Sequence, residues 1–150
     1  MPIELPVPWV IALNALGLPA LQLGWALAFT KMPAAWFDPP PPGKDRSAAY
    51  ERLLAIKRWK DRLPDGASWF EGGFAKAELR RRDPRHLREF LRETWRGELC
   101  HWTVLAFIPL FFLWNPWWGD LVIGVYALAA NLPCILVQRY NRQRLQRVLG

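Results

Sequence analysis

The sequence predicts an all-α integral membrane protein with about three transmembrane helices, one near the N-terminus and then a helical hairpin. Charged residues avoid three apolar windows, at 7–29, 102–114 and 121–137, and crowd the intervals between them. An ionised side chain at the bilayer centre costs at least about 2.5 kcal/mol, so this segregation is typical of membrane proteins. We therefore treat residues 1–150 as one membrane domain.

The basic residues predict the orientation of these helices. Of the 20 Lys and Arg, 16 lie within 31–96 and the other four follow the last apolar run, whereas the turn at 115–120 carries only Asp120. Cytoplasmic loops carry an excess of Lys and Arg. We therefore expect the N-terminus outside and both the 31–96 region and the C-terminus inside. The net charge of +7 then indicates contact with a membrane surface, and no nucleic-acid partner is expected.

The first apolar run, residues 7–29, is expected to be an uncleaved span. A signal peptide begins with a basic segment, whereas this chain begins MPIELP and carries Glu4. Trp9 and Trp25 lie near the two ends, where interfacial aromatic residues belong. Asn14 and Gln22, which are polar residues inside the run, are expected to bond neighbouring helices.

Residues 30–95 are expected to form a cytoplasmic region of amphipathic helices and loops. Four prolines at 39–42 cannot donate backbone hydrogen bonds and favour a stiff, extended spacer. A helix is predicted from about 45 to 63, ended by the turn residues Pro-Asp-Gly. The aromatic and glycine residues at 69–74 resemble a loop that dips into the membrane interface. A basic amphipathic helix then starts at 83–84, with an acid before a proline.

The second span is predicted at 96–114, and its start places two polar residues at headgroup depth. The apolar stretch 102–114 makes about 20 Å of helix, whereas the hydrocarbon core is about 30 Å thick, so the span must begin earlier. Glu98 and His101 are three residues apart and share a helical face. There a carboxylate can fix the tautomer of an imidazole that acts as a general base. The alternative is that both residues form structural bonds to a neighbouring helix.

The third span is predicted at 120–137, followed by a basic tail at 138–150. Gln138, Arg139, Tyr140, Asn141 and Arg142 leave the membrane on the same side as His101. They suit phosphate or sugar hydroxyl groups, although a basic tail that binds anionic lipid would look the same.

Asn131, Cys100 and Cys134 are further polar or sulfur-containing residues of the second and third spans. Asn131 either offers its amide to the site or bonds two helices together. Cys100 and Cys134 lie toward the reducing compartment, so a disulfide is not expected, and their spacing does not indicate a metal site.

Three stretches together resemble the bacterial glycosyl-4,4'-diaponeurosporenoate acyltransferases. They are KRWKDRLPDG, then ETWRGELCHW with its apolar run and Asn115, and finally YALAANLPCILVQRYNRQRL. The resemblance runs from about Phe29 to the C-terminus. It implies transfer of a fatty acyl group from an activated thioester to a hydroxyl of a glycosylated carotenoid or similar glycolipid. The proline run and the arginine-rich stretch at 80–85 depart from the family pattern, which leaves the acceptor open.

The resemblance also implies partners and a location. The donor is expected to be acyl-CoA or acyl carrier protein, with no tightly bound cofactor. The site is expected at the bacterial cytoplasmic (inner) membrane, in contact with the lipid bilayer and with other biosynthetic or membrane subunits as further partners. The competing hypothesis is a non-enzymatic small membrane subunit that scaffolds a larger membrane complex.

We assign roles by chemistry to the residues that match the family motifs. His101 is the expected general base and Glu98 is expected to orient it. Arg96, Lys57 and Lys60 are expected to hold the phosphates of the donor. Arg139, Asn141 or Asn131 is expected to hold the sugar or the developing oxyanion. The remaining residues predicted to bind substrate are Trp59, Gln138, Tyr140 and Arg142.

Overall fold

The computed structural model describes residues 2–63 and 84–149, and these residues form helices and connecting segments without a strand. The longer helices are α1 (Val7–Lys31), α2 (Ser47–Leu54), α3 (Pro84–Phe107) and α4 (Trp117–Leu149). Short 3-10 helices are η1 (Ala34–Phe37), η2 (Ile56–Arg58), η3 (Lys60–Arg62) and η6 (Ile108–Leu113). Within the described ranges, α1, α3 with η6, and α4 are long and apolar enough to cross a membrane. The predicted fold class is therefore confirmed.

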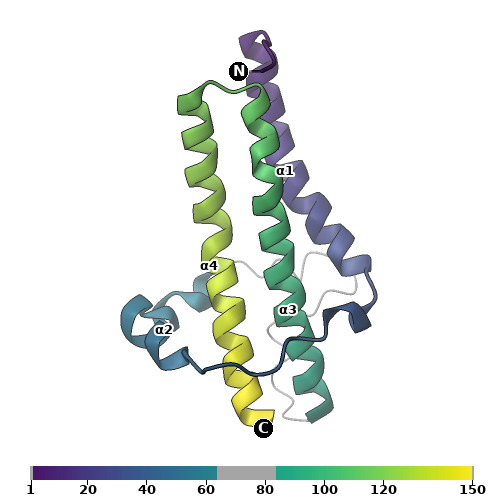
Figure 1. The fold of residues 1–150 in the computed structure, drawn as a ribbon, viewed down its shortest axis with the longest axis vertical. Helices are drawn as coiled ribbons and strands as arrows, with labels where there is room; N and C mark the ends of the chain where they lie inside the picture. The colour runs from purple at the N-terminus through teal and green to yellow at the C-terminus, as the bar shows by residue number, and fades with distance from the viewer. Residues whose placement is uncertain (1, 64–83, 150) are drawn as a thin grey trace.

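The helical hairpin consists of α3, η6 and α4, which run side by side in opposite directions (Figure 1). Its core near the turn is formed by Ile108, Phe111, Ile123 and Ala127. Leu18 and Leu21 of α1 are among the side chains packed against this cluster. Apolar side chains thus join the three long helices at the end of the hairpin where η6 meets α4.

Helix α1 lies beside α3, and its N-terminal part is tied to the turn of the hairpin (Figure 1). Asn14 Nδ2 donates to Asn115 Oδ1 at 2.7 Å, and Asn115 Nδ2 donates back to Asn14 Oδ1 at 3.0 Å. Trp114 Nε1 also donates to Asn14 Oδ1 at 3.0 Å. Amides inside an apolar environment need such partners. The prediction that Asn14 bonds a neighbouring helix is therefore confirmed.

The segment after α1 crosses the other end of the hairpin (Figure 1), where side chains of α3 and α4 hold it. Gln146 Nε2 donates to the carbonyl of Pro40 at 3.0 Å, and the backbone N–H of Arg46 donates to Gln143 Oε1 at 3.1 Å. Arg92 of α3 pairs with Asp38 at 2.6 Å. Prolines cannot donate, so the bond to Pro40 is made through its carbonyl.

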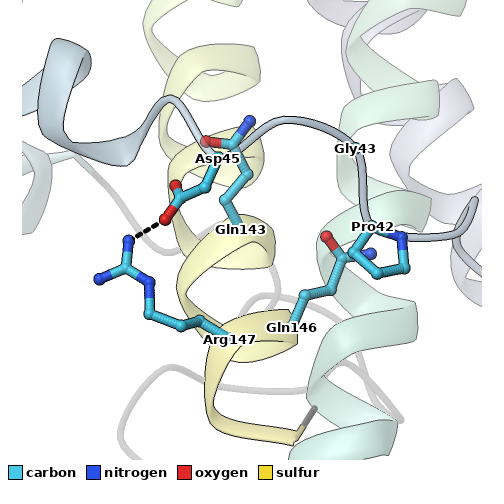
Figure 2. Close-up of a pocket in the computed structure, with 6 residues that line it drawn as sticks. All are labelled: Pro42, Gly43, Asp45, Gln143, Gln146 and Arg147. Atoms are coloured by element: carbon cyan, nitrogen blue, oxygen red, sulfur yellow. Dashed lines mark hydrogen bonds and ion pairs between the residues drawn. The ribbon is translucent and has the colours of Figure 1, made fainter.

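A small pocket of about 170 Å³ opens between this segment and the end of α4. Figure 2 shows Gln143, Gln146 and Arg147 of α4 facing the segment that carries Pro42, Gly43 and Asp45, with Arg147 turned toward Asp45. None of the predicted site residues lines the pocket. The pocket therefore marks where the segment packs on α4, and it is separate from the predicted site residues.

The helix predicted from about 45 to 63 is interrupted in the structure. Helix α2 ends at Leu54, and Ala55 adopts a left-handed conformation with φ of 46°. Trp59 Nε1 donates to the carbonyl of Leu54 at 2.8 Å, which satisfies one of the free carbonyls at the helix end. The chain turns there so that Ile56 reaches a fully buried position against α4. The prediction of one continuous helix was wrong because burial of Ile56 favours a break.

Helix α4 continues beyond the predicted third span and includes the tail almost to its end. Pro133 lies inside α4 without ending it. Helix α3 runs from Pro84 to Phe107, so the predicted amphipathic helix continues without a break into the second span, whose later part forms η6. The predicted turn that begins at Pro64 and the aromatic loop at 69–74 lie outside the described residues.

Candidate active site at the α3–α4 interface

His101 of α3 faces Asn131 of α4. The two side chains are joined by a 2.8 Å contact between His101 Nδ1 and Asn131 Oδ1. Gln22 Nε2 of α1 reaches the same oxygen at 3.3 Å. Asn131 is almost fully buried, whereas His101 is half-buried. Side chains from α1, α3 and α4 therefore meet at the amide oxygen of Asn131.

Glu98 lies one helical turn from His101 and binds two arginines of α4. Arg139 Nε is 2.5 Å from Glu98 Oε1, and Arg142 Nη2 is 2.6 Å from Glu98 Oε2. Trp102 Nε1 donates to Glu98 Oε1 at 3.3 Å. Only 1% of Glu98 is exposed. Two guanidinium groups are stronger partners for a carboxylate than an imidazole, so Asn131 takes the position at His101 that was expected for Glu98.

Tryptophan rings cover both arginines of this cluster. The guanidinium of Arg142 lies 4.8 Å from the ring centroid of Trp95, and that of Arg139 lies 5.7 Å from the ring centroid of Trp102. The side chain of Arg142 is only 10% exposed, whereas that of Arg139 is 41% exposed. Stacking on an aromatic face suits a guanidinium that is partly removed from water. Arg139 is thus the member of the pair that a ligand can reach.

Gln138 of α4 and Arg96 of α3 make different contacts near this cluster. A Cβ atom on Gly97 would come within 2.9 Å of Gln138 Nε2, so the glycine gives Gln138 room against α3. Arg96 pairs with Glu93 at 2.9 Å and donates to the carbonyl of Met32 at 3.3 Å. Its guanidinium also lies 4.7 Å from the ring centroid of Phe37. Arg96 therefore holds the end of α1 and η1.

Tyr140 and Lys57 belong to a different cluster, on the face of α4 that packs against α2 and η2. The hydroxyl of Tyr140 donates to Glu51 at 2.7 Å, and Lys57 pairs with Glu51 at 2.7 Å. These bonds, that of Lys57 first, hold the pKa of Glu51 below its ordinary value of 4.5. Trp59 packs against the same cluster, beside the fully buried Tyr140.

The structure therefore separates residues that were expected to act together. Lys60 pairs with its neighbour Asp61 at 2.5 Å. Lys57 pairs with Glu51 of α2, whereas Arg96 bonds Met32 at the end of α1. Helices α1 and α2 lie on opposite sides of the hairpin (Figure 1). Asn141 is half-buried on α4. The residues that do converge are His101, Asn131, Glu98, Arg139 and Arg142, with Gln138 beside them.

Gln22 was expected to bond a neighbouring helix and was not among the residues expected at the site. The only signal in the sequence was one amide within an apolar run, and that signal does not say which helix the amide will meet. The contact with Asn131 confirms that Gln22 bonds a neighbouring helix and adds it to the site. Chemically, the arrangement offers an imidazole to accept a proton, and an arginine, held by the carboxylate of Glu98, to bind an anionic group.

Comparison with known proteins gives one family. The model of the glycosyl-4,4'-diaponeurosporenoate acyltransferases matches residues 33–150. A protein of that name from Staphylococcus haemolyticus (strain JCSC1435) is 33% identical over 102 residues, which cover 67% of this chain and 58% of the relative. Its namesake from Staphylococcus aureus (strain USA300) is 32% identical over 101 residues, which cover 67% and 60%. The chain thus spans less than two thirds of the length of these relatives. No solved structure matches.

Proposed function

The chain belongs to the glycosyl-4,4'-diaponeurosporenoate acyltransferase family, and from this membership we propose that it is a membrane O-acyltransferase. It moves a fatty acyl group from an activated thioester to a hydroxyl of a glycosylated carotenoid or similar glycolipid. The observation that carries the proposal is the convergence of His101 and Asn131 with the arginine cluster around Glu98. A hydroxyl nucleophile needs a base, and an activated thioester needs a site for the anionic carrier to which the acyl group is attached.

The proposed reaction uses the imidazole of His101 as general base. It takes the proton from the acceptor hydroxyl as the oxygen attacks the thioester carbonyl carbon, so that a new C–O bond forms. The tetrahedral intermediate collapses, the C–S bond breaks, and the imidazolium returns its proton to the departing thiolate. Atoms and charges balance without a tightly bound cofactor.

The arginine cluster supplies the anion site in this mechanism. Arg139 is partly exposed and pairs with Glu98, which lies one turn from His101 along α3, so we assign Arg139 to the phosphate of acyl-CoA or of the prosthetic arm of acyl carrier protein. Glu98 then holds Arg139 and Arg142 in place. This role replaces the expected one, in which Glu98 orients His101. Lys57 pairs with Glu51, which also bonds Tyr140, and Lys60 pairs with Asp61, so both lysines are left out of the donor site.

We also propose the bacterial cytoplasmic (inner) membrane as the location, with the N-terminus outside and the C-terminus inside. Support comes from the arginines of α3 and α4, which lie at 85–96 and 139–147, in the parts of the two helices farthest along the chain from the turn between them. Reporter fusions test the orientation. A reporter at the C-terminus that is active only in the cytoplasm should give a signal, and a periplasm-dependent reporter there should give none. The opposite pattern would contradict the orientation.

Transfer of a labelled acyl group to a glycosylated lipid in detergent tests the activity. We expect His101→Gln to reduce turnover by at least about 100-fold, since general-base catalysis contributes that much or more. His86→Gln on the same helix is the matched control and should keep its turnover. Full turnover in His101→Gln removes the general-base role. Inactivity of the parent protein with every acceptor and donor favours the non-enzymatic scaffold.

A further inference from the structure

We infer that Gln22 and Asn131 are positioning residues that hold His101 as the tautomer with its proton on Nδ1, which leaves the Nε2 lone pair free. The purpose of that lone pair rests on the proposed function, but the tautomer itself does not. The inference extends the site to α1, which lies outside the stretch matched by the family model. It also gives Asn131 a role that differs from substrate binding.

The backbone of α4 fixes which way the Asn131 amide points. Asn131 Nδ2 donates to the carbonyl of Ala127 at 2.9 Å. A carbonyl only accepts, so the nitrogen of the amide must face Ala127 and the oxygen must face away from it. The reversed amide would place two acceptors against each other in a buried setting. The atom that faces His101 is therefore Oδ1.

The orientation of Asn131 in turn determines the proton on His101. Asn131 Oδ1 can only accept, and His101 Nδ1 lies 2.8 Å from it, so Nδ1 must carry a hydrogen. A neutral imidazole has one N–H, and Nε2 is then unprotonated. Imidazole side chains in water favour the opposite tautomer, with the proton on Nε2. The contact thus selects the less common form, and that form presents a base at the outer nitrogen of the ring.

Gln22 keeps this oxygen in place from the side of α1. Its Nε2 donates to Asn131 Oδ1 at 3.3 Å, so the oxygen accepts from two helices at once. The position of Gln22 depends on α1 packing closely on the hairpin. Asn14 bonds Asn115 two helical turns earlier, and a Cβ atom on Gly17 would lie only 3.0 Å from Phe111. The contacts of Asn14 and Gly17 therefore hold α1 against the hairpin, and this position of α1 places Gln22 beside Asn131.

Nuclear magnetic resonance of ¹⁵N-labelled histidine tests the inference directly, because the two tautomers give distinct nitrogen shifts. The chain has only two histidines, so a His86→Asn background leaves one signal. The full-length protein in nanodiscs at about pH 8, above the usual histidine pKa of about 6.5, should show Nδ1 protonated. An Nε2-protonated ring in this protein would overturn the inference.

Substitutions then test each positioning residue. Asn131→Leu removes the acceptor and should move the signal to the Nε2-protonated form, whereas Asn131→Asp keeps an acceptor and should keep the Nδ1 proton. Gln22→Leu should add a fraction of the Nε2-protonated form. An unchanged signal in Asn131→Leu refutes the role of Asn131, and an unchanged signal in Gln22→Leu refutes that of Gln22.

Asn14→Leu controls for general loosening of α1. It removes the bond between α1 and the hairpin at the far end, so it should lower the melting temperature and leave the His101 signal as it is. A shift of the tautomer in Asn14→Leu as large as that in Gln22→Leu would refute a specific role for Gln22. The spectra thus separate the hydrogen bond from the packing of the helix that carries it.

Turnover separates this inference from the proposed function. Asn131→Leu should lower kcat by about 10- to 100-fold with little change in KM, because the misplaced proton removes the base and spares the binding groups. If His101→Gln keeps full turnover while the spectra show the Nδ1 proton, the proposed function fails and the tautomer stands. If Asn131→Leu changes the spectra but not kcat, the positioning role in catalysis fails.

Discussion

Glu98 and Arg139, 41 residues apart in the chain, meet between α3 and α4 with 2.5 Å between Oε1 and Nε. The carboxylate also pairs with Arg142, and its exposed fraction is 1%. A charge this deeply buried is retained only where it is paired. The pairs of Glu98 with Arg139 and Arg142 therefore fix the register of α3 against α4 next to His101.

Glu98→Gln should destabilise the protein by about 3 kcal/mol or more, because two partly buried guanidinium groups lose their counter-charge. Glu89→Gln is the matched control, since its pair with Arg85 is exposed, and its loss should stay within about 0.5 kcal/mol. Unfolding by denaturing detergent measures both. Equal losses of unfolding free energy in the two variants would show that the buried pairs of Glu98 stabilise the protein no more than the exposed pair of Glu89.

Substitution of Gly97 should depend strongly on the size of the new side chain. In Gly97→Ala the new methyl group meets only the flexible end of Gln138, so the strain is offset by an alanine's higher helix propensity, about 1 kcal/mol. Gly97→Leu has no such room and should cost more than about 2 kcal/mol by forcing α3 from α4. Thermal unfolding measures both changes. Gly24→Leu is the control and should be tolerated, because nothing lies within 4 Å of its added Cβ. A stable Gly97→Leu protein would contradict the close approach.

The amide pair of Asn14 and Asn115 should couple α1 to the turn. A double-mutant cycle with Asn14→Leu and Asn115→Leu should give a coupling free energy of about 0.6 kcal/mol, with about 1.7 kcal/mol as the upper end for bonds inside membranes. Asn115 is 4% exposed, so its single substitution should cost more than that of Asn14. Additive effects of the two substitutions would argue against a direct bond.

The bond network of Glu51 should make the docking of α2 depend on pH. The folded-state pKa of Glu51 lies below 4.5, so the charged form stabilises the fold at pH values above about 4.5. That stabilisation should be lost as pH falls through the lower folded-state pKa. The difference in melting temperature between the parent and Glu51→Gln should therefore be largest near pH 7 and vanish at acid pH. A difference that is constant with pH would contradict a charged Glu51.

Much of this protein could be predicted from its sequence because a membrane imposes strong constraints on composition. The three apolar windows and the basic intervals fixed the number and approximate position of the long helices. The polar residues Asn14 and Gln22 could be expected to bond other helices, because an amide inside a bilayer needs a partner. Spacing alone also placed Glu98 and His101 on one side of the same helix.

Tertiary structure decided which of these polar groups meet. Whether His101 faces a carboxylate or an amide depends on the rotation of α4 about its own axis, and no local pattern encodes that rotation. The same rotation divides the predicted substrate residues, sending Tyr140 to Glu51 and Arg139 and Arg142 to Glu98. A long apolar run without charges determines that a helix can cross the membrane, whereas the packing of the three helices determines which polar atoms remain available for chemistry.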